Sequence, residues 1–163
     1  MKFFLLRHAS RDSAFGLSDN GLNEVGHQEA LFLKTFFNFP DLPPLEERLL
    51  LSSPKRRARE TLTPLSQEWN LPVEVDLLLD EMSPSEDFGA FLKRIKDFRL
   101  ALSAREVSLA IACTHNDWIP EFTQKYLGEN IDLRKAAFIE MELDPHQCRL
   151  VRVVQDVRRL TDK

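Results

Sequence analysis

Short apolar runs that alternate with helix-length amphipathic segments restrict the fold of this sequence more than any other feature. Residues 2–6, 48–51 and 107–113 are mostly apolar runs too short for stable helices, so each is predicted to be a buried strand. Strands that alternate with helices usually pair in parallel and are covered by helices on both faces. The sequence therefore predicts an α/β three-layer sandwich with a mostly parallel central sheet.

Two further apolar runs lie near the end of the chain and flank a turn. Residues 138–143 and 148–154 are separated by residues 144–147, whose sequence DPHQ begins with a turn-forming Asp-Pro pair. Two strands joined by so short a connection pair antiparallel. We therefore predict a terminal antiparallel hairpin beside the parallel strands.

The segments between the first strands have the residue spacing of helices. The first helix is predicted to begin near Asn20, which would cap it. Pro64 lies inside the second helical pattern, where it is expected to kink the helix or to restart it with Thr63 as the cap. The predicted buried stripes are Leu22, Val25, Phe32 and Phe36 in the first helix, and Ala58, Leu62, Leu65 and Trp69 in the second.

Polar residues also mark the predicted starts of the last two helices. Ser83 and Glu86 have the spacing of a capping box, with a proline at the first helical position. Asn116 or Asp117 is the predicted cap of the last helix. The third helix is expected to bury a face made of Phe88, Phe91, Ile95, Phe98 and Leu102.

Length and charge set further limits. The chain has 163 residues, so we expect one domain over residues 1–163. Its net charge of −4 argues against a nucleic-acid or anionic membrane surface as a partner. The apolar start is interrupted by Arg7 and His8 before it is long enough for a signal peptide or membrane span, so a cytoplasmic protein is expected.

The two cysteines and four histidines show no metal-binding pattern. Cys113 and Cys148 lack a CxxC spacing, and the histidines lack HxH or HxxxH spacing, so no metal site or cofactor is expected. Neither cysteine is followed six residues later by arginine, which excludes a protein-tyrosine phosphatase. Both thiols are expected to be buried.

Basic and imidazole side chains follow three of the predicted strands. Arg7 and His8 follow the first, Arg57 lies in the segment after the second, and His115 follows the third. The carboxyl ends of neighbouring parallel strands meet at one edge of the sheet, where such folds bind ligands. Arginine pairs with phosphoryl oxygens, and neutral histidine has a nitrogen lone pair that can attack phosphorus. The sequence therefore predicts a site for a tetrahedral phosphoryl dianion.

Four segments resemble the motifs of the histidine phosphatase superfamily, which includes the phosphoglycerate mutases, and they occur in the family's order. They are residues 6–10 (LRHAS), 17–21 (LSDNG), 52–61 (SSPKRRARET) and 114–115 (TH). The resemblance implies that His8 becomes phosphorylated in a covalent intermediate and that Arg7 and Arg57 bind the phosphoryl group. It also implies that His115 is the second histidine of the site, which holds phosphoryl oxygens.

The region around Glu81 is similar to the segment in which family members keep an acidic residue, so Glu81 is the candidate proton donor. Residues 80–84 (DEMSP) most resemble the small SixA-type phosphohistidine phosphatases. The short segment between Glu81 and the third strand leaves no room for a helical cap over the site. One departure from the family pattern is Ala9, where a glycine is usual.

Three functions fit this pattern. The first is a phosphatase that acts on phosphohistidine or another phosphoprotein through phospho-His8. The second is a small-molecule phosphomonoesterase or mutase with the same site. The third is a phosphate-binding interaction module that has lost turnover through Ala9 or an unsuitable Glu81. The sequence does not determine the oligomeric state or choose the physiological substrate.

Overall fold

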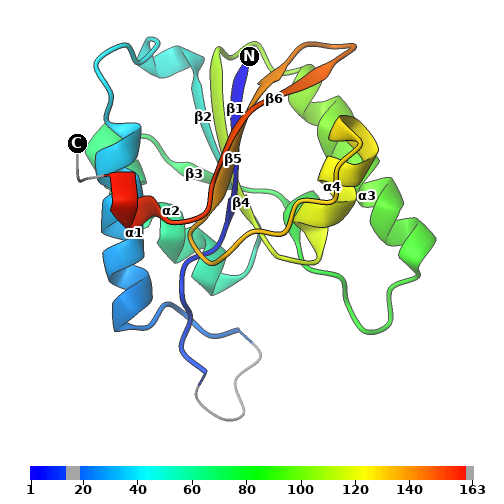
Figure 1. Cartoon of the computed structure of the whole chain (residues 1–163), viewed down its shortest axis with the longest axis horizontal. Helices are drawn as coiled ribbons and strands as arrows, with labels where there is room; N and C mark the ends of the chain where they lie inside the picture. The colour runs from blue at the N-terminus through cyan, green and yellow to red at the C-terminus, as the bar shows by residue number, and fades with distance from the viewer. Residues whose placement is uncertain (14–18, 161–163) are drawn as a thin grey trace.

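The computed structural model describes residues 1–13 and 19–160, and Figure 1 shows strands that alternate with helices along most of the chain. Residues 17 and 18 of the second sequence motif lie outside the described residues. The elements in chain order are β1 (Lys2–Arg7), α1 (Glu24–Phe37), η1 (Leu45–Glu47), β2 (Arg48–Ser52), α2 (Arg56–Trp69), β3 (Val73–Val75), η2 (Leu77–Leu79), α3 (Phe88–Ser103), β4 (Leu109–Thr114), α4 (Trp118–Leu127), β5 (Phe138–Leu143), β6 (Cys148–Val154) and η3 (Val157–Leu160).

The strands form a mixed sheet of order β3-β2-β4-β1-β5-β6. The first four in this order run parallel, whereas β5 pairs antiparallel with both β1 and β6. The α/β class, the mostly parallel sheet and the terminal hairpin are therefore confirmed. The short edge strand β3 was not predicted, because three residues are too few to show a period.

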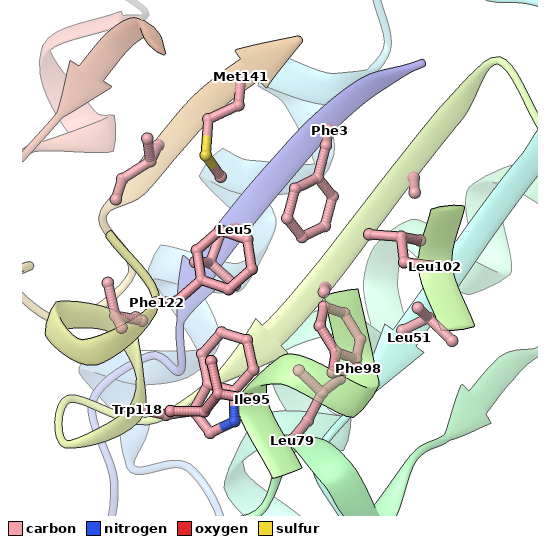
Figure 2. Close-up of a cluster of buried hydrophobic side chains, with 14 of the residues drawn as sticks. Phe3, Leu5, Leu51, Leu79, Ile95, Phe98, Leu102, Trp118, Phe122 and Met141 are labelled. Atoms are coloured by element: carbon pink, nitrogen blue, oxygen red, sulfur yellow. The ribbon is translucent and has the colours of Figure 1, made fainter. Parts of the chain in front are cut away.

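Two helices cover each face of the sheet, with α1 and α2 on one side and α3 and α4 on the other (Figure 1). Alternation along β1 supplies both layers, since Phe3 and Leu5 face α3 and α4 while Phe4 and Leu6 face α1 and α2. Figure 2 shows the α3/α4 layer, in which aromatic rings from the helices pack on β1. Both faces are therefore mostly apolar, and the buried histidines lie beyond the strand ends.

The first helix begins later than predicted. Asn23, and not Asn20, is its N-cap, and the Asn23 side chain accepts from the amide of Gly26. Asn20 is buried in the preceding loop, where it donates to the carbonyl of Asp12. The buried stripe is also shifted, because Val25 is 53% exposed. The side of α1 that faces the sheet carries Gly26, Ala30, Leu33 and Phe37.

The structure excludes one of the two predicted effects of Pro64 on the second helix and corrects the predicted start of the third. Helix α2 continues through Pro64 without restarting at Thr63. Helix α3 is capped by Asp87, and the predicted capping box lies in the turn before it, where Ser83 donates its amide to Glu86. The box residues thus close a separate turn instead of the first turn of the helix.

Asp117 occupies the N-cap position of α4 but makes no capping hydrogen bond. Its carboxylate instead accepts from the amide of Met82 at 2.7 Å. The predicted capping role is therefore wrong for Asp117, whose side chain contacts a neighbouring loop, and Oδ1 of Asn116, the other predicted cap, has no hydrogen-bond partner among the described residues. The bond between Met82 and Asp117 fixes the loop that carries Glu81 against the start of α4.

The cysteines differ in burial. Cys113 is buried and Cys148 only partly so, which corrects the expectation that both are buried. Burial raises the pKa of Cys113 to about 12 and that of Cys148 to about 11, so both thiols stay protonated at neutral pH. Within residues 1–13 and 19–160, every helix is too short or too polar to cross a bilayer.

Candidate phosphoryl-transfer site

Three adjacent strand ends place the site residues at one edge of the sheet. Strand β4 lies between β1 and β2, and its carboxyl end holds the backbone beyond both neighbours. The amide of His8 donates to Thr114 O at 3.1 Å, and that of Ser53 donates to Cys113 O at 3.0 Å. The segments that carry the predicted residues therefore converge on the end of β4.

The two predicted histidines lie side by side although 107 positions separate them in the chain. The ring centroids of His8 and His115 are 5.3 Å apart, with an angle of 57° between the ring planes. Only 6% of His8 and 2% of His115 is exposed. Two imidazoles thus border one small buried volume.

The hydrogen bonds of His8 determine which ring nitrogen can react. Its Nδ1 lies 2.8 Å from the carbonyl oxygen of Ala9, which can only accept. Nδ1 therefore carries the proton of the neutral ring, and Nε2 keeps a lone pair. That lone pair faces Nε of Arg57 at 3.3 Å. His8 presents the nitrogen that a nucleophile requires.

Arg57 is the centre of the site. It is 1% exposed, and its Nη2 contacts Oε2 of Glu81 at 2.5 Å and Nδ1 of His115 at 3.4 Å. Its Nη1 is buried without a hydrogen-bond partner among the described residues. A buried, unpaired donor on a guanidinium is costly unless an anion completes it. The Nε and Nη2 edge of Arg57 thus faces both imidazoles, where it can donate to an oxyanion.

Glu81 lies at the mouth of the same site. Besides its bond to Arg57, its carboxylate lies 3.6 Å from Nζ of Lys55 and 3.8 Å from Nδ1 of His115. The Glu81 side chain is 35% exposed, so its own carboxylate can turn toward water, and an anion bound to Arg57 would then replace it as the partner of the guanidinium. In this structure its carboxylate faces the cations that an incoming phosphoryl group would contact.

Arg7 lies close enough to His8 for its charge to lower the pKa of that ring. Its Nη1 donates to Leu133 O at 2.7 Å, and its Nε is a second buried donor without a partner among the described residues. Arg7 also lines an open cleft of about 830 Å³ between residues 132–134 and 153–156. Its side chain therefore reaches a cavity large enough for an organic group.

The surroundings keep His8 neutral. The pKa of His8 falls from 6.5 to about 4, mainly because of burial; the hydrogen bond to Ala9 opposes this fall, and the positive charges of Arg57, Arg7 and Lys135 add to it. For His115, burial is again the main cause, followed by Arg57 and then His8, and the pKa falls to about 2. Both rings are therefore uncharged at neutral pH when no ligand is bound.

This gives a prediction for the pH dependence of turnover. A nucleophilic His8 must be neutral, so the acid limb of kcat/KM should lie near pH 4 and not near the ordinary histidine pKa of 6.5. The measurement is a pH profile with an aryl phosphate, corrected for the titration of the substrate itself. A limb centred on 6.5 would contradict the buried, neutral state of His8.

The same burial makes the protein less stable in acid. Below pH 6.5 the histidines of the unfolded chain bind protons that the folded histidines do not take up until about pH 4 and about pH 2. The unfolded state then holds more protons, so the free energy of unfolding falls as the pH drops through this window.

Thr61 holds the peptide that orients His8. Its Oγ1 accepts from the amide of Ala9 at 2.9 Å and donates to the carbonyl of Arg57 at 2.8 Å. Ala9 is fully buried and belongs to the apolar cluster under α1 and α2, so its methyl group is accommodated by the core. Thr61 thus connects the segment after β1 to the helix that carries Arg57.

Thr61→Val is therefore expected to lower both stability and activity. The substitution preserves shape but leaves the Ala9 amide buried and unpaired, which should reduce the free energy of unfolding by about 2 kcal/mol. Urea denaturation and aryl phosphate turnover measure the two effects. Thr63→Val is the matched control, because exposed Thr63 makes the same bond within the helix, to Arg59 O, but among the described residues it accepts no hydrogen bond from outside the helix. Equal losses in the two variants would contradict the proposed contribution of Thr61.

Some residues of the site were not assigned from the sequence. Ser53 contacts Nε2 of His115 at 2.7 Å, and Asp80 lies within hydrogen-bonding distance of Ser53. Ser53 and Thr61 fall inside the third motif, so their position in that motif was the available signal. Among the described residues, no group of three or more His, Cys, Asp or Glu side chains is arranged to hold a metal ion.

Solved structures with this fold include several phosphatases. The α-ribazole phosphatase from Shigella flexneri aligns with a TM-score of 0.79 at 18% identity, over 96% of this chain and 97% of that one. The protein histidine phosphatase SixA, solved with tungstate, gives 0.74 at 20% identity, over 98% and 99%. A phosphoserine phosphatase from Entamoeba histolytica, in complex with phosphoserine, gives 0.75 at 15% identity, over 98% of each chain.

Sequence comparison assigns the family. No curated protein sequence matches the chain. The family profile described as histidine phosphatase superfamily (branch 1) matches residues 3–86, which is just over half of the chain and includes the segments of Arg7, His8 and Arg57. The chain belongs to the histidine phosphatase superfamily.

Proposed function

We propose that this protein is a phosphatase that works through a covalent phosphohistidine on His8, with phosphohistidine or another phosphorylated protein group as its substrate. The Nε2 lone pair of His8 attacks phosphorus, and the bond from phosphorus to the leaving oxygen or nitrogen breaks. Water then attacks phospho-His8, which releases phosphate and restores the neutral ring.

The observation that carries this proposal is the fixed tautomer of His8 beside an incompletely bonded Arg57. Nδ1 donates to Ala9 O, so Nε2 keeps its lone pair, and Arg57 Nη1 has no hydrogen-bond partner among the described residues. Nucleophile and oxyanion donors are thus next to each other before any ligand arrives. Such preorganisation is a major source of catalysis in phosphoryl transfer.

The other side chains take complementary roles in this proposal. Arg7, Arg57 and His115 hold the phosphoryl oxygens, and Glu81 supplies a proton to the leaving group. The 35% exposed side chain of Glu81 can move from Arg57 toward the departing atom when a phosphoryl group takes its place. A phosphohistidine substrate needs this proton least, because its P–N bond is already labile.

The lack of a helical cap between Glu81 and β4 favours a substrate carried on another protein. The stretch from Glu81 to the start of β4 is fully described, and α3 is its only helix. This helix packs on the sheet through Phe91, Ile95, Phe98 and Leu102, so it does not cover the site. The similarity in fold to SixA, a protein histidine phosphatase, supports the same substrate class.

A small phosphorylated metabolite is the second candidate. The cleft of about 830 Å³ beside Arg7 could hold an organic leaving group. The α-ribazole phosphatase and the phosphoserine phosphatase with similar folds are named for small substrates. The same catalytic residues would serve either substrate.

Substrate comparison in the presence of a chelator tests the proposal. We expect turnover of a phosphohistidine protein to exceed that of every phosphate monoester in a metabolite panel, and a labile phosphoryl group on the protein in intact-mass spectra. High kcat/KM on one metabolite would favour the second candidate. Stabilisation by tungstate with no hydrolysis of any substrate would identify an idle phosphate-binding module.

A further inference from the structure

His115 faces the proposed phosphoryl site with a nitrogen that carries no proton in this structure. Its Nδ1 lies 3.4 Å from Nη2 of Arg57, and a guanidinium can only donate. Nδ1 is therefore an acceptor, and the proton of the neutral ring is on Nε2. A phosphoryl oxygen is also an acceptor, so Nδ1 must gain a proton before His115 can hold it.

The other ring nitrogen begins a hydrogen-bond chain that ends on a carboxylate. Nε2 of His115 donates to Ser53 Oγ at 2.7 Å, and Ser53 Oγ donates to Oδ1 of Asp80 at 3.4 Å. The amide of Lys55 also donates to Ser53 Oγ, at 3.2 Å. Two donors thus use both lone pairs of the hydroxyl, so its own proton is directed to Asp80. The chain therefore favours a proton on Nε2.

Because Nε2 keeps its proton, Nδ1 can become a donor only if the ring gains a second one. We propose that Ser53 and Asp80 are positioning residues that stabilise His115 as an imidazolium while a phosphoryl group is bound, so that binding takes up a proton on Nδ1. The proton comes from solvent when the anion binds and returns when phosphate leaves. This inference rests on the proposed function, since it concerns the same site.

The charges around His115 explain why the ring changes state only with a ligand. Cationic groups near it are Arg57 and Lys55 at the start of α2 and Arg11 after β1, with neutral His8 beside them; the acidic groups are Asp80 and Glu81 after η2. Without a bound anion, burial and the nearby cations lower the pKa of His115 and keep the ring neutral. A bound dianion adds negative charge next to Nδ1. On the other side of the ring, Oδ1 of Asp80 supplies negative charge 4.0 Å from Nε2.

Calorimetric titration with tungstate tests this coupling. Proton uptake is obtained by repeating the titration in buffers of different ionisation enthalpy, at mildly alkaline pH where tungstate remains a dianion. The wild type should take up about one proton per tungstate bound, as required if the ring changes from neutral to charged. His115→Asn should abolish that uptake.

Two substitutions distinguish the contribution of the Ser53 hydroxyl from that of the Asp80 negative charge. Asp80→Asn keeps the Oδ1 acceptor used by Ser53 and by the amide of Glu81 but removes the negative charge. Ser53→Ala removes the connection and keeps the charge. Both should lower proton uptake and weaken tungstate binding by about tenfold, the scale of one charge-assisted hydrogen bond. Ser53→Thr should restore uptake, and Ser85→Ala is the control at an exposed serine.

Each outcome bears on a distinct statement. Tungstate binding without proton uptake in the wild type, or full uptake in both Ser53→Ala and Asp80→Asn, would overturn the imidazolium proposal but leave the phosphoryl site intact. Failure of the wild type to bind tungstate would overturn both the imidazolium and the proposed function. Thermal unfolding without ligand identifies a variant that has lost its fold. If Ser53→Ala has done so, the isosteric Asp80→Asn alone tests the imidazolium proposal.

Discussion

Replacing His8 with asparagine is expected to lower kcat/KM for an aryl phosphate by about four orders of magnitude or more, the scale found when a covalent nucleophile is removed. An asparagine amide can still donate to Ala9 O in place of Nδ1, at the position where that bond now measures 2.8 Å. It offers no ring nitrogen to attack phosphorus. Steady-state hydrolysis and intact-mass spectra measure the losses of turnover and of the phosphoryl adduct.

The control for this variant is His27→Asn, since His27 is an exposed histidine on α1 and has no place in the site. It should retain full activity. The His8 variant should still bind tungstate, because Arg57 and His115 remain. Turnover near the wild-type level in His8→Asn would rule out the covalent mechanism.

Replacing Arg57 with lysine should lower kcat/KM by about 10²- to 10³-fold, although the positive charge is kept. Arg57 uses Nε toward His8 and Nη2 toward Glu81 and His115, while Nη1 has no partner among the described residues. A lysine ammonium is a single point with rotating donors and cannot match this planar set. Kinetics with an aryl phosphate, together with tungstate affinity, measure the effect.

Arg59→Lys provides the comparison, because Arg59 is exposed on the same helix. It should change neither activity nor tungstate affinity. If Arg57→Lys retained wild-type kcat/KM, charge alone would account for the contribution of Arg57, and the geometric argument would be wrong.

The sheet could be predicted from the sequence because a strand that is buried on both faces consists mostly of apolar residues. Residues 2–6 and 107–113 are mostly apolar runs, and they correspond to β1 and β4 with small shifts at the ends. The edge strand β3 has one partly buried and two exposed residues, so it lacks such a run. Local composition therefore identifies central strands better than edge strands.

Helix starts were less predictable because several polar residues compete for each cap. Asn20 and Asn23 both suit the start of α1, and tertiary contacts decide between them: Asn20 is buried against Asp12, which leaves Asn23 to cap the helix. The same competition placed the start of α3 at Asp87 and not at Ser83. Local propensity does not include these longer-range contacts.

The candidate site also has one part that could be predicted from the sequence and one part that could not. Arg7, His8, Arg57 and His115 could be named because they lie in motifs at strand ends, and the structure brings the two imidazoles and Arg57 into contact. The hydrogen bond between Ser53 and Asp80 could not be predicted, since these residues are 27 positions apart and meet only in the folded structure. Such contacts follow from the fold and leave no periodic pattern.

The position of β4 between β1 and β2 has a consequence for synthesis of the protein on the ribosome. Until residues 109–115 have emerged, the strands that carry His8 and Ser53 have no common neighbour, and each lacks its ladder partner along that edge. The nascent N-terminal half therefore lacks both the central strand of the sheet and the imidazole of His115. A fragment that ends at residue 86 should bind no oxyanion, because the last strand to enter the centre of the sheet also completes the pocket.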